Sequence, residues 1–379
     1  MRAAIYNSHL LPMGGSERVT LETISVLSHI GWDVDLYLIA KFIPSDLAAG
    51  FGRLAEGRCR FRMTKVPARR QDPYGLRRGG PYLELARNIL DKRIEECDVF
   101  IDMVPFLSSH FALYFRLPNV TYWNLVPSDL SVREHGLIGR AYVVPLRVLA
   151  RNFSYRWKRV RLHIANSEFT RSTIIDRLRA DLETIVIYPP VDIQLWSSNP
   201  ENSELRRGIV SLGRFEDWKR HDLQLKIARG INSPFRMIGR AIRYNEIEEL
   251  RRVKAAAANN RNIEFYVNIS QTEAKRILTS SKVFVHTADS EPFGISIVEA
   301  IAAGCIPIVR NNGGASEIVP CDDLRFDTIV EAQQKVRMAL KGEYDYLARE
   351  LKEHIQMFDR KEFRRKLEQS LLRLTSEDT

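Results

Sequence analysis

The chain has 379 residues, of which 45% are hydrophobic and 27% charged, and its formal net charge is +10. This composition is typical of a globular protein that is long enough for two domains with full cores. The four cysteines are scattered and form no CxxC pair, which disfavours both a disulfide framework and a zinc site. No apolar run reaches the about 18 residues of a membrane-spanning helix, and the run after Met1 is too short for a signal peptide. We therefore expect a cytoplasmic protein.

The first half of the chain alternates short apolar strands with amphipathic helices. Ser16 is placed to cap a helix that runs to about Ile30, where Gly31 stops it. The strands predicted for this half cover residues 3–6, 33–40, 98–103, 120–123, 163–165 and 184–188. Two prolines, at 189 and 190, then break the pattern, and the polar stretch over 197–203 predicts a linker.

After this linker the pattern restarts, with strands predicted over residues 209–213, 235–239, 263–267, 283–286 and 306–309. Strands that alternate with helices in this way predict parallel sheets covered on both faces. We therefore expect an α/β protein with two doubly wound, Rossmann-like domains that face each other across a cleft. The predicted domains cover 1–195 and 205–358, and a C-terminal helix over 359–379 is expected to pack back toward the first domain.

A pair of glutamates marks the second domain. Glu291 precedes a Pro-Phe-Gly turn, and Glu299 lies eight positions later in an apolar run that predicts a helix. Gly294 allows a sharp backbone turn, and the N–H groups at the start of the helix favour an anion. Both carboxylates can then line one cleft and accept hydrogen bonds from hydroxyls on either side of a phosphate, which suits a nucleotide-sugar. The alternative is an ordinary amphipathic helix with a carboxylate in its capping turn.

Three loops favour phosphate chemistry. Arg214 and Lys219 follow a strand end, where a guanidinium can hold a diphosphate at two points and an ammonium can act as a point charge. Basic residues in loops are also often only solvated. Gly14 and Gly15 open the first helix and resemble a phosphate-binding loop without the GxGxxG fingerprint, although they can equally serve only the turn. A second glycine turn, over 311–317, either closes the sugar pocket or is only a loop.

These motifs together resemble glycosyltransferase family 4, whose members have the GT-B fold. The run from Glu291 to Glu299 is similar to that family's pair of glutamates, and the loop over 213–219 is similar to its phosphate-binding loop. The segments that extend the resemblance over essentially the whole chain are 165–167, 188–192, 304–309 and 313–317. The loop at 14–18 and the segment 142–170 are most similar to mannosyltransferases that extend lipid-linked oligosaccharides.

The resemblance implies a role for each matching residue. Glu291 would be a catalytic residue that contacts hydroxyls of the donor sugar, and Glu299 would hold the ribose. The diphosphate would be bound by basic side chains and by the backbone at a helix start, which are Arg214, Lys219, Phe293, Gly294, Ile295 and Ser296. Gly14 and Gly15 would form a phosphate or acceptor loop.

The resemblance also implies the reaction. It would be a retaining transfer of a hexose, of the mannose or glucose type, from a GDP- or UDP-sugar to a glycan or lipid-linked acceptor. It would need no metal and no other cofactor, because the basic side chains and the helix end stabilise the charge.

Two positions depart from the family. Asn124 stands at the catalytic position where many relatives carry a histidine that reaches the donor sugar, and an asparagine can hydrogen-bond a hydroxyl but does not titrate. The run Phe265-Tyr266-Val267-Asn268 stands where many relatives have a glycine near the nucleotide base, which leaves the base preference open. The alternative to an enzyme is therefore a catalytically silent GT-B scaffold or binding subunit. A dinucleotide-dependent oxidoreductase is disfavoured because no GxGxxG follows the first strand.

The basic charge is concentrated in residues 53–78 and 133–161. Arg140, Arg147, Arg151 and Lys158 are spaced seven, four and seven residues apart, which places them on one face of a helix. Such a face predicts peripheral attachment to an anionic membrane surface, on its cytoplasmic side, or binding to the phosphate of a lipid-linked acceptor. A solvated basic face is the alternative. No nucleic-acid partner is expected, because aromatic and basic residues are not interleaved.

Overall fold

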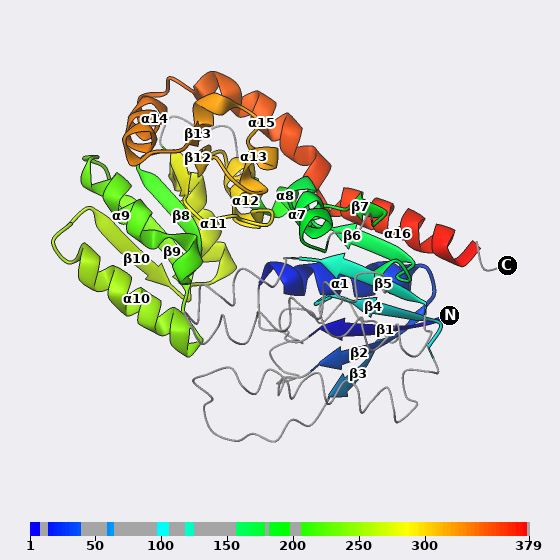
Figure 1. Ribbon diagram of the computed structural model, residues 1–379. Coiled ribbons are helices and arrows are strands. Elements are labelled where there is room, and N and C mark those ends of the chain that lie inside the picture. The colour runs from blue at the N-terminus through cyan, green and yellow to red at the C-terminus, as the bar shows by residue number, and fades with distance from the viewer. Residues whose placement is uncertain are drawn as a thin grey trace. The chain divides into compact units, whose positions relative to one another are not determined.

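The computed structural model describes residues 1–7, 14–38, 59–63, 97–105, 118–124, 157–178, 182–197 and 206–376. It divides into two compact units, each built on one sheet (Figure 1). The N-terminal unit is Met1–Pro190 with Arg360–Thr379, and the C-terminal unit is Val191–Asp359. Most of the predicted basic stretches over 53–78 and 133–161, most of the predicted linker, and residues 11–13 of the first glycine loop lie outside the described residues.

The sheet of the N-terminal unit is parallel and has the order β3-β2-β1-β4-β5-β6-β7. Its strands are β1 (Arg2–Asn7), β2 (Asp33–Leu38), β3 (Cys59–Met63), β4 (Val99–Asp102), β5 (Asn119–Trp123), β6 (Leu162–Ala165) and β7 (Thr184–Val186). Its described helices are α1 (Gly15–His29), α7 (Glu168–Leu178) and α16 (Arg360–Ser376). The strands predicted for this half are all found, with ends that shift by one or two residues.

Strand β3 was not predicted, because it lies in a segment whose dominant signal is positive charge. Cysteine, phenylalanine and methionine alternate there with Arg60 and Arg62, which is the period of a strand. The strand pairs with β2 at the edge of the sheet, where Arg60 Nε donates to Asp35 Oδ1 at 3.0 Å. Arg60 therefore pairs with the buried carboxylate of Asp35 as well as adding to the positive net charge.

The start of α1 corrects one prediction. The helix begins at Gly15 with Gly14 as its N-cap, so Ser16 lies inside the first turn, and among the described residues no side chain caps this helix. Ser16 Oγ instead accepts a hydrogen bond from Asn124 Nδ2 at 3.4 Å. The predicted stop is confirmed, because Gly31 has a φ of +84° directly after the C-cap Ile30.

The last helix, α16, packs against the N-terminal unit. Phe363, Leu367, Leu371 and Leu374 lie on its buried face and join the core formed by the sheet and α1. On the rim of this contact, Arg364 Nε donates to Glu22 Oε2 at 2.6 Å. The two ends of the chain therefore belong to one unit, because the apolar stripe of α16 covers the sheet (Figure 1).

The sheet of the C-terminal unit is also parallel and has the order β10-β9-β8-β11-β12-β13. Its strands are β8 (Ile209–Arg214), β9 (Phe235–Arg240), β10 (Ile263–Val267), β11 (Val283–His286), β12 (Ile306–Arg310) and β13 (Arg325–Phe326). Its α-helices are α8 (Ile193–Trp196), α9 (His221–Arg229), α10 (Tyr244–Ala257), α11 (Gln271–Ser280), α12 (Ile295–Ala302), α13 (Ala315–Ile318), α14 (Ile329–Lys341) and α15 (Ala348–His354). The five predicted strands are found, and among the described residues of this unit only the two-residue β13 was missed.

The boundary between the units lies before the predicted end of the first domain at residue 195. Val191 forms an isolated parallel bridge with Asp359, and its N–H donates to the carbonyl of Phe358 at 3.2 Å. Helix α8 follows at once and packs against α12, with Ile193 and Trp196 buried. Residues 191–197 are therefore part of the C-terminal unit, because their apolar side chains are covered there.

Leu371→Ala tests whether α16 is part of the core. Leu371 is fully buried, so removing its methyl groups should lower the free energy of unfolding by about 2–5 kcal/mol. Its neighbour Leu372 is 46% exposed, so Leu372→Ala is a matched control that should change stability by no more than about 0.5 kcal/mol. Urea denaturation of both variants measures the difference. Equal effects would show that α16 does not bury its apolar stripe.

Candidate functional site

The strand order of the C-terminal unit creates a topological switch point. From β8 the chain moves outward through β9 and β10, and it then returns to the other side of β8 with β11. In open parallel sheets, ligands bind outside the carboxyl ends of the strands at such a point. The loop with Arg214 and Lys219 follows β8, and the turn with Glu291 follows β11. The two predicted motifs thus meet at the switch point.

The turn before α12 is shaped by its backbone. Ser290 and Gly294 have positive φ angles of 52° and 112°. The turn buries Glu291, which is 7% exposed, and α12 begins at Ile295. As predicted, Glu291 lies in the turn and Glu299 in the helix. No side chain within the C-terminal unit's described residues caps α12, so its first N–H groups are available to an anion.

The second glycine turn packs directly behind the first. The N–H of Gly314 donates to the carbonyl of Glu291 at 2.7 Å. A Cβ on Gly313 would lie 2.5 Å from the Glu291 carbonyl oxygen, and one on Gly314 would lie 2.4 Å from that of Pro292. Both positions require glycine because two backbones touch there. This turn supports the Glu291 turn from behind.

Glu291 is held by two donors that converge on one of its oxygens. Lys219 Nζ lies 2.5 Å from Oε2, and His286 Nε2 lies 3.1 Å from the same atom. Burial by itself would raise the pKa of this carboxyl, but the Lys219 charge and the His286 hydrogen bond outweigh burial and lower the pKa to about 2. Glu291 is therefore ionised at neutral pH, and its Oε1 has no protein partner among the described residues.

His286 was missed by the sequence analysis. It is the last residue of β11 and is 4% exposed. Burial lowers its pKa, and this effect exceeds the opposite effect of Glu291. The signal that could have found it is a polar residue at the carboxyl end of a buried strand, five positions before the glutamate.

The loop that carries Lys219 is fastened to the loop after β11. Thr287 Oγ1 donates to the carbonyl of Lys219 at 2.9 Å, and the N–H of Asp289 donates to the carbonyl of Trp218 at 2.9 Å. The Lys219 ammonium also lies 4.0 Å from the centre of the Trp218 ring. Arg220 closes the loop with a φ of 54° and pairs with Asp289 at 3.0 Å. Lys219 therefore reaches Glu291 from a fixed loop.

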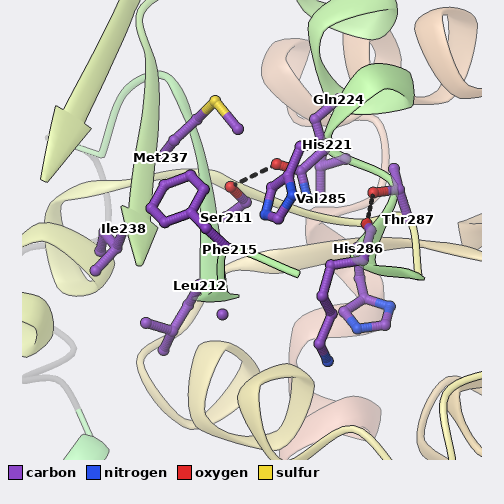
Figure 2. Close-up of a pocket in the computed structure, with 12 residues that line it drawn as sticks. Ser211, Leu212, Phe215, His221, Gln224, Met237, Ile238, Val285, His286 and Thr287 are labelled. Atoms are coloured by element: carbon purple, nitrogen blue, oxygen red, sulfur yellow. Dashed lines mark hydrogen bonds between the residues drawn. The ribbon is translucent and has the colours of Figure 1, made fainter. Parts of the chain in front are cut away.

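Figure 2 shows the small pocket beneath this loop, which reaches to the side chain of His286. Ser211 Oγ of β8 donates to Gln224 Oε1 of α9 at 3.0 Å, drawn as a dashed line, and the ring of Phe215 stacks on His221 with centroids 5.0 Å apart. These contacts fix the start of α9 against the strand ends. The floor of the site is therefore packed from both β8 and α9.

The other predicted donor-binding residues have different surroundings. Arg214 ends β8, is partly exposed, and its guanidinium lies 3.2 Å from Glu216 Oε1. Phe293 is buried with its ring 5.2 Å from that of Phe358, so only its backbone can contact a donor. Ile295 and Ser296 are half-buried in the first turn of α12, and Glu299 is buried on the same helix.

Asn124 and the first glycine loop lie together at the carboxyl edge of the N-terminal sheet. Asn124 follows β5, and its Nδ2 donates to the carbonyl of Met103 at 3.2 Å and to Ser16 Oγ at 3.4 Å. Ser16 is in the turn that Gly14 and Gly15 open. The Asn124 amide thus links the ends of β4 and β5 to the start of α1, while its Oδ1 has no partner among the described residues.

Asn268 directly follows β10 and has a left-handed backbone conformation. It has a φ of 56°, a conformation that asparagine tolerates better than most residues. Its side chain binds both backbone groups of Ala241, accepting from the N–H at 3.0 Å and donating to the carbonyl at 3.2 Å. The ends of β9 and β10 are therefore tied together by this side chain.

Within the described ranges, no group of three or more histidine, cysteine, aspartate or glutamate side chains is arranged to hold a metal ion. In the same part of the chain, no helix is both long and apolar enough to cross a membrane.

Solved structures establish the fold class. The chain is similar to a sucrose-phosphate synthase from Thermosynechococcus elongatus, with a TM-score of 0.79 and 14% identity over 99% of both chains. It is also similar to the Anabaena protein HepE in complex with UDP-glucose, with a TM-score of 0.72 and 18% identity over 98% of this chain and 99% of that one. The two parallel-sheet units are therefore those of the GT-B fold, as predicted.

Sequence comparison relates part of the chain to known glycosyl transferases. Residues 193–334 match the family described as Glycosyl transferases group 1. A Mus musculus GDP-Man:Man(3)GlcNAc(2)-PP-Dol alpha-1,2-mannosyltransferase is 30% identical over 167 residues, which are 40% of this chain and 34% of the relative. The Kluyveromyces lactis alpha-1,3/1,6-mannosyltransferase ALG2 is 22% identical over 359 residues, 82% of this chain and 69% of the relative. The chain spans about a third of the first relative's length.

The ionised state of Glu291 predicts a pH dependence of stability. Because its pKa falls from 4.5 to about 2 on folding, its stabilising contribution is present above about pH 5 and is lost as the pH falls through 4.5 toward 2. His286, whose pKa is also lowered, acts in the same direction below its ordinary value of 6.5. The difference in unfolding free energy between the wild type and Glu291→Gln should therefore shrink between about pH 7 and pH 3. Urea denaturation at each pH measures it, and a constant difference would contradict the ion pair.

Proposed function

We propose that the protein is a retaining glycosyltransferase that moves a hexose from a nucleotide-diphosphate sugar to a glycan or lipid-linked acceptor. One observation carries this proposal. At the switch point of the C-terminal sheet, Lys219 and the ionised Glu291 are paired directly before the uncapped start of α12. The cation and the helix start can bind a diphosphate, and the fixed carboxylate can accept hydrogen bonds from the hydroxyls of an attached sugar.

The diphosphate of the donor would lie at the switch point, between Lys219 and the start of α12. Arg214, Lys219 and the N–H groups of Ile295 and Ser296 would hold the phosphate oxygens, and Glu299 would accept from the ribose hydroxyls. The Lys219 ammonium has three donors, so it can keep Glu291 and bind a phosphate oxygen as well. The second oxygen of Glu291, Oε1, would accept from a hydroxyl of the sugar.

Transfer would break the bond between the anomeric carbon and the phosphate oxygen and form a bond from that carbon to the acceptor oxygen on the same face. The negative charge that develops on the leaving diphosphate would be stabilised by Arg214, Lys219 and the start of α12. The leaving phosphate would take the acceptor's proton, so the non-titrating Asn124 need not act as a base. These basic groups support a reaction that requires no metal.

The donor and acceptor classes are proposed from similar proteins. The Mus musculus relative is named for GDP-mannose and a PP-Dol-linked acceptor, and the Anabaena structure holds UDP-glucose. Both support a nucleotide-diphosphate hexose as donor. A thermal-shift panel of GDP-, UDP- and ADP-sugars would identify the base, because a ligand that binds only the folded state raises the melting temperature.

An activity assay tests the function. The protein should transfer or slowly hydrolyse the nucleotide-sugar that the panel selects, and EDTA should leave the rate unchanged. A strict requirement for magnesium or manganese would contradict the proposed charge stabilisation. Binding without turnover on any acceptor would favour a silent scaffold, and no binding of any nucleotide-sugar would reject the proposal.

The two glutamates should have separable effects. If Glu299 holds the ribose, Glu299→Ala should weaken binding of the free nucleoside diphosphate, whereas Glu291→Ala should leave that binding nearly intact and lower turnover. Loss of a hydrogen bond to a charged group costs roughly 1.5–3 kcal/mol, so we expect changes of about tenfold or more. Calorimetry with the diphosphate measures binding. If Glu291→Ala lost binding and Glu299→Ala did not, the assignment would be wrong.

We further propose that the protein attaches peripherally to an anionic membrane surface on its cytoplasmic side. In the described part of the predicted basic segment, Lys158, Arg159 and Arg161 are exposed directly before β6. Each basic residue near an anionic bilayer contributes about 1 kcal/mol, which gives reversible attachment. The PP-Dol acceptor named for the relatives supports a membrane-bound substrate.

Liposome co-sedimentation tests the attachment. Binding should need anionic lipid and should weaken in high salt. Replacing Lys158, Arg159 and Arg161 by glutamine should weaken binding to anionic liposomes. The matched control is the same change at the exposed Arg251, Lys254 and Arg261 of the other unit, which should leave this binding unchanged. Binding that ignores lipid charge and salt would contradict the proposal and favour a soluble acceptor.

A further inference from the structure

The contact between His286 and Glu291 is not used in the binding proposed for the diphosphate and the ribose. His286 ends β11 and is buried, with its Nε2 3.1 Å from Glu291 Oε2. The ionised Glu291 has no proton to donate, so Nε2 must carry the hydrogen and donate it. The other ring nitrogen, Nδ1, is buried and has no partner among the described residues. A hydrogen on Nδ1 would leave a buried donor unsatisfied, so burial selects the same tautomer.

Two donors therefore fix one oxygen of Glu291 and leave the other available. Lys219 Nζ and His286 Nε2 both bind Oε2. The two donors differ in stiffness, because Lys219 is a point charge on a flexible chain, whereas the His286 ring is buried and lies beside Phe284 with centroids 6.5 Å apart. When the ammonium also binds a phosphate oxygen, the stiffer His286 ring still fixes the position of the carboxylate.

We propose that His286 is a positioning residue that holds Oε2 of Glu291 so that Oε1 accepts a hydrogen bond from a hydroxyl of the donor sugar. This inference rests on the proposed function and assigns the sugar end of the donor to the His286–Glu291 pair. The neutral ring suits the role, because an imidazolium would be a second cation beside Lys219. The charged groups that face His286 are Glu291, from the turn after β11, and Lys219, from the loop after β8.

Substitution of His286 should lower the rate of sugar transfer and leave binding of the diphosphate unchanged. His286→Leu removes the donor, so kcat should fall by about 10- to 100-fold while the dissociation constant of the free nucleoside diphosphate stays within about twofold. His286→Gln keeps an N–H group at a similar reach and should recover much of the loss. Val283→Ala, at a buried position of the same strand, is the control for packing and should leave kcat within about twofold.

The pH profile gives a second readout. In His286→Leu the Glu291 carboxyl loses one of the groups that lower its pKa, so the acid limb of kcat should move to higher pH. In the wild type, histidine-selective nitrogen NMR should show the neutral Nε2–H tautomer of His286 between about pH 6.5 and pH 8, because burial lowers its pKa from the ordinary 6.5. An imidazolium or an Nδ1–H tautomer there would overturn the proposal.

The results for the wild type and for His286→Leu distinguish failure of this inference from failure of the proposed function. A wild-type protein that neither binds nor turns over any nucleotide-sugar overturns both. A wild-type enzyme whose His286→Leu variant keeps full turnover overturns the inference alone. Equal loss of diphosphate binding and turnover in that variant also overturns it, because His286 would then only support the fold.

Discussion

The buried ion pair between Lys219 and Glu291 is the interaction on which the C-terminal unit's site depends. A carboxylate as buried as Glu291 is costly unless it is paired and hydrogen-bonded. Lys219 and His286 satisfy that need on one oxygen. The pair joins loops that are 72 residues apart in sequence, so the site exists only when β8 and β11 are neighbours in the sheet.

The surrounding contacts have the effect of fixing both members of this pair. Thr287 binds the backbone of the lysine loop, and the turn at Gly313 and Gly314 presses on the backbone of the glutamate turn. Such packing leaves each loop few alternatives, so the site is held ready before a ligand arrives. A preorganised site of this kind can stabilise developing charge without first reorganising.

In the N-terminal unit, the neutral side chain of Asn124 joins neighbouring loops, in contrast to the ion pair at Glu291. Asn124 lies where a titratable histidine is common in the family that the sequence resembles, but its amide is used to join Met103 and Ser16 across the sheet edge. A neutral amide can make these bonds at any ordinary pH, because it does not titrate. The described carboxyl edge of the N-terminal sheet is thus joined to the start of α1 by hydrogen bonds of a neutral amide.

The sequence by itself determined the alternation of strands and helices, the Glu291 turn and the basic loop after β8, because period and turn chemistry are local properties. It did not reveal strand β3, whose charge concealed its period, and it misplaced the start of α1 at Ser16. His286 was also missed, because its contact with Glu291 forms only when both side chains are buried in the folded unit. Only the tertiary structure decided which side chains meet, because pairing across a sheet follows strand order, and strand order is set by the whole core.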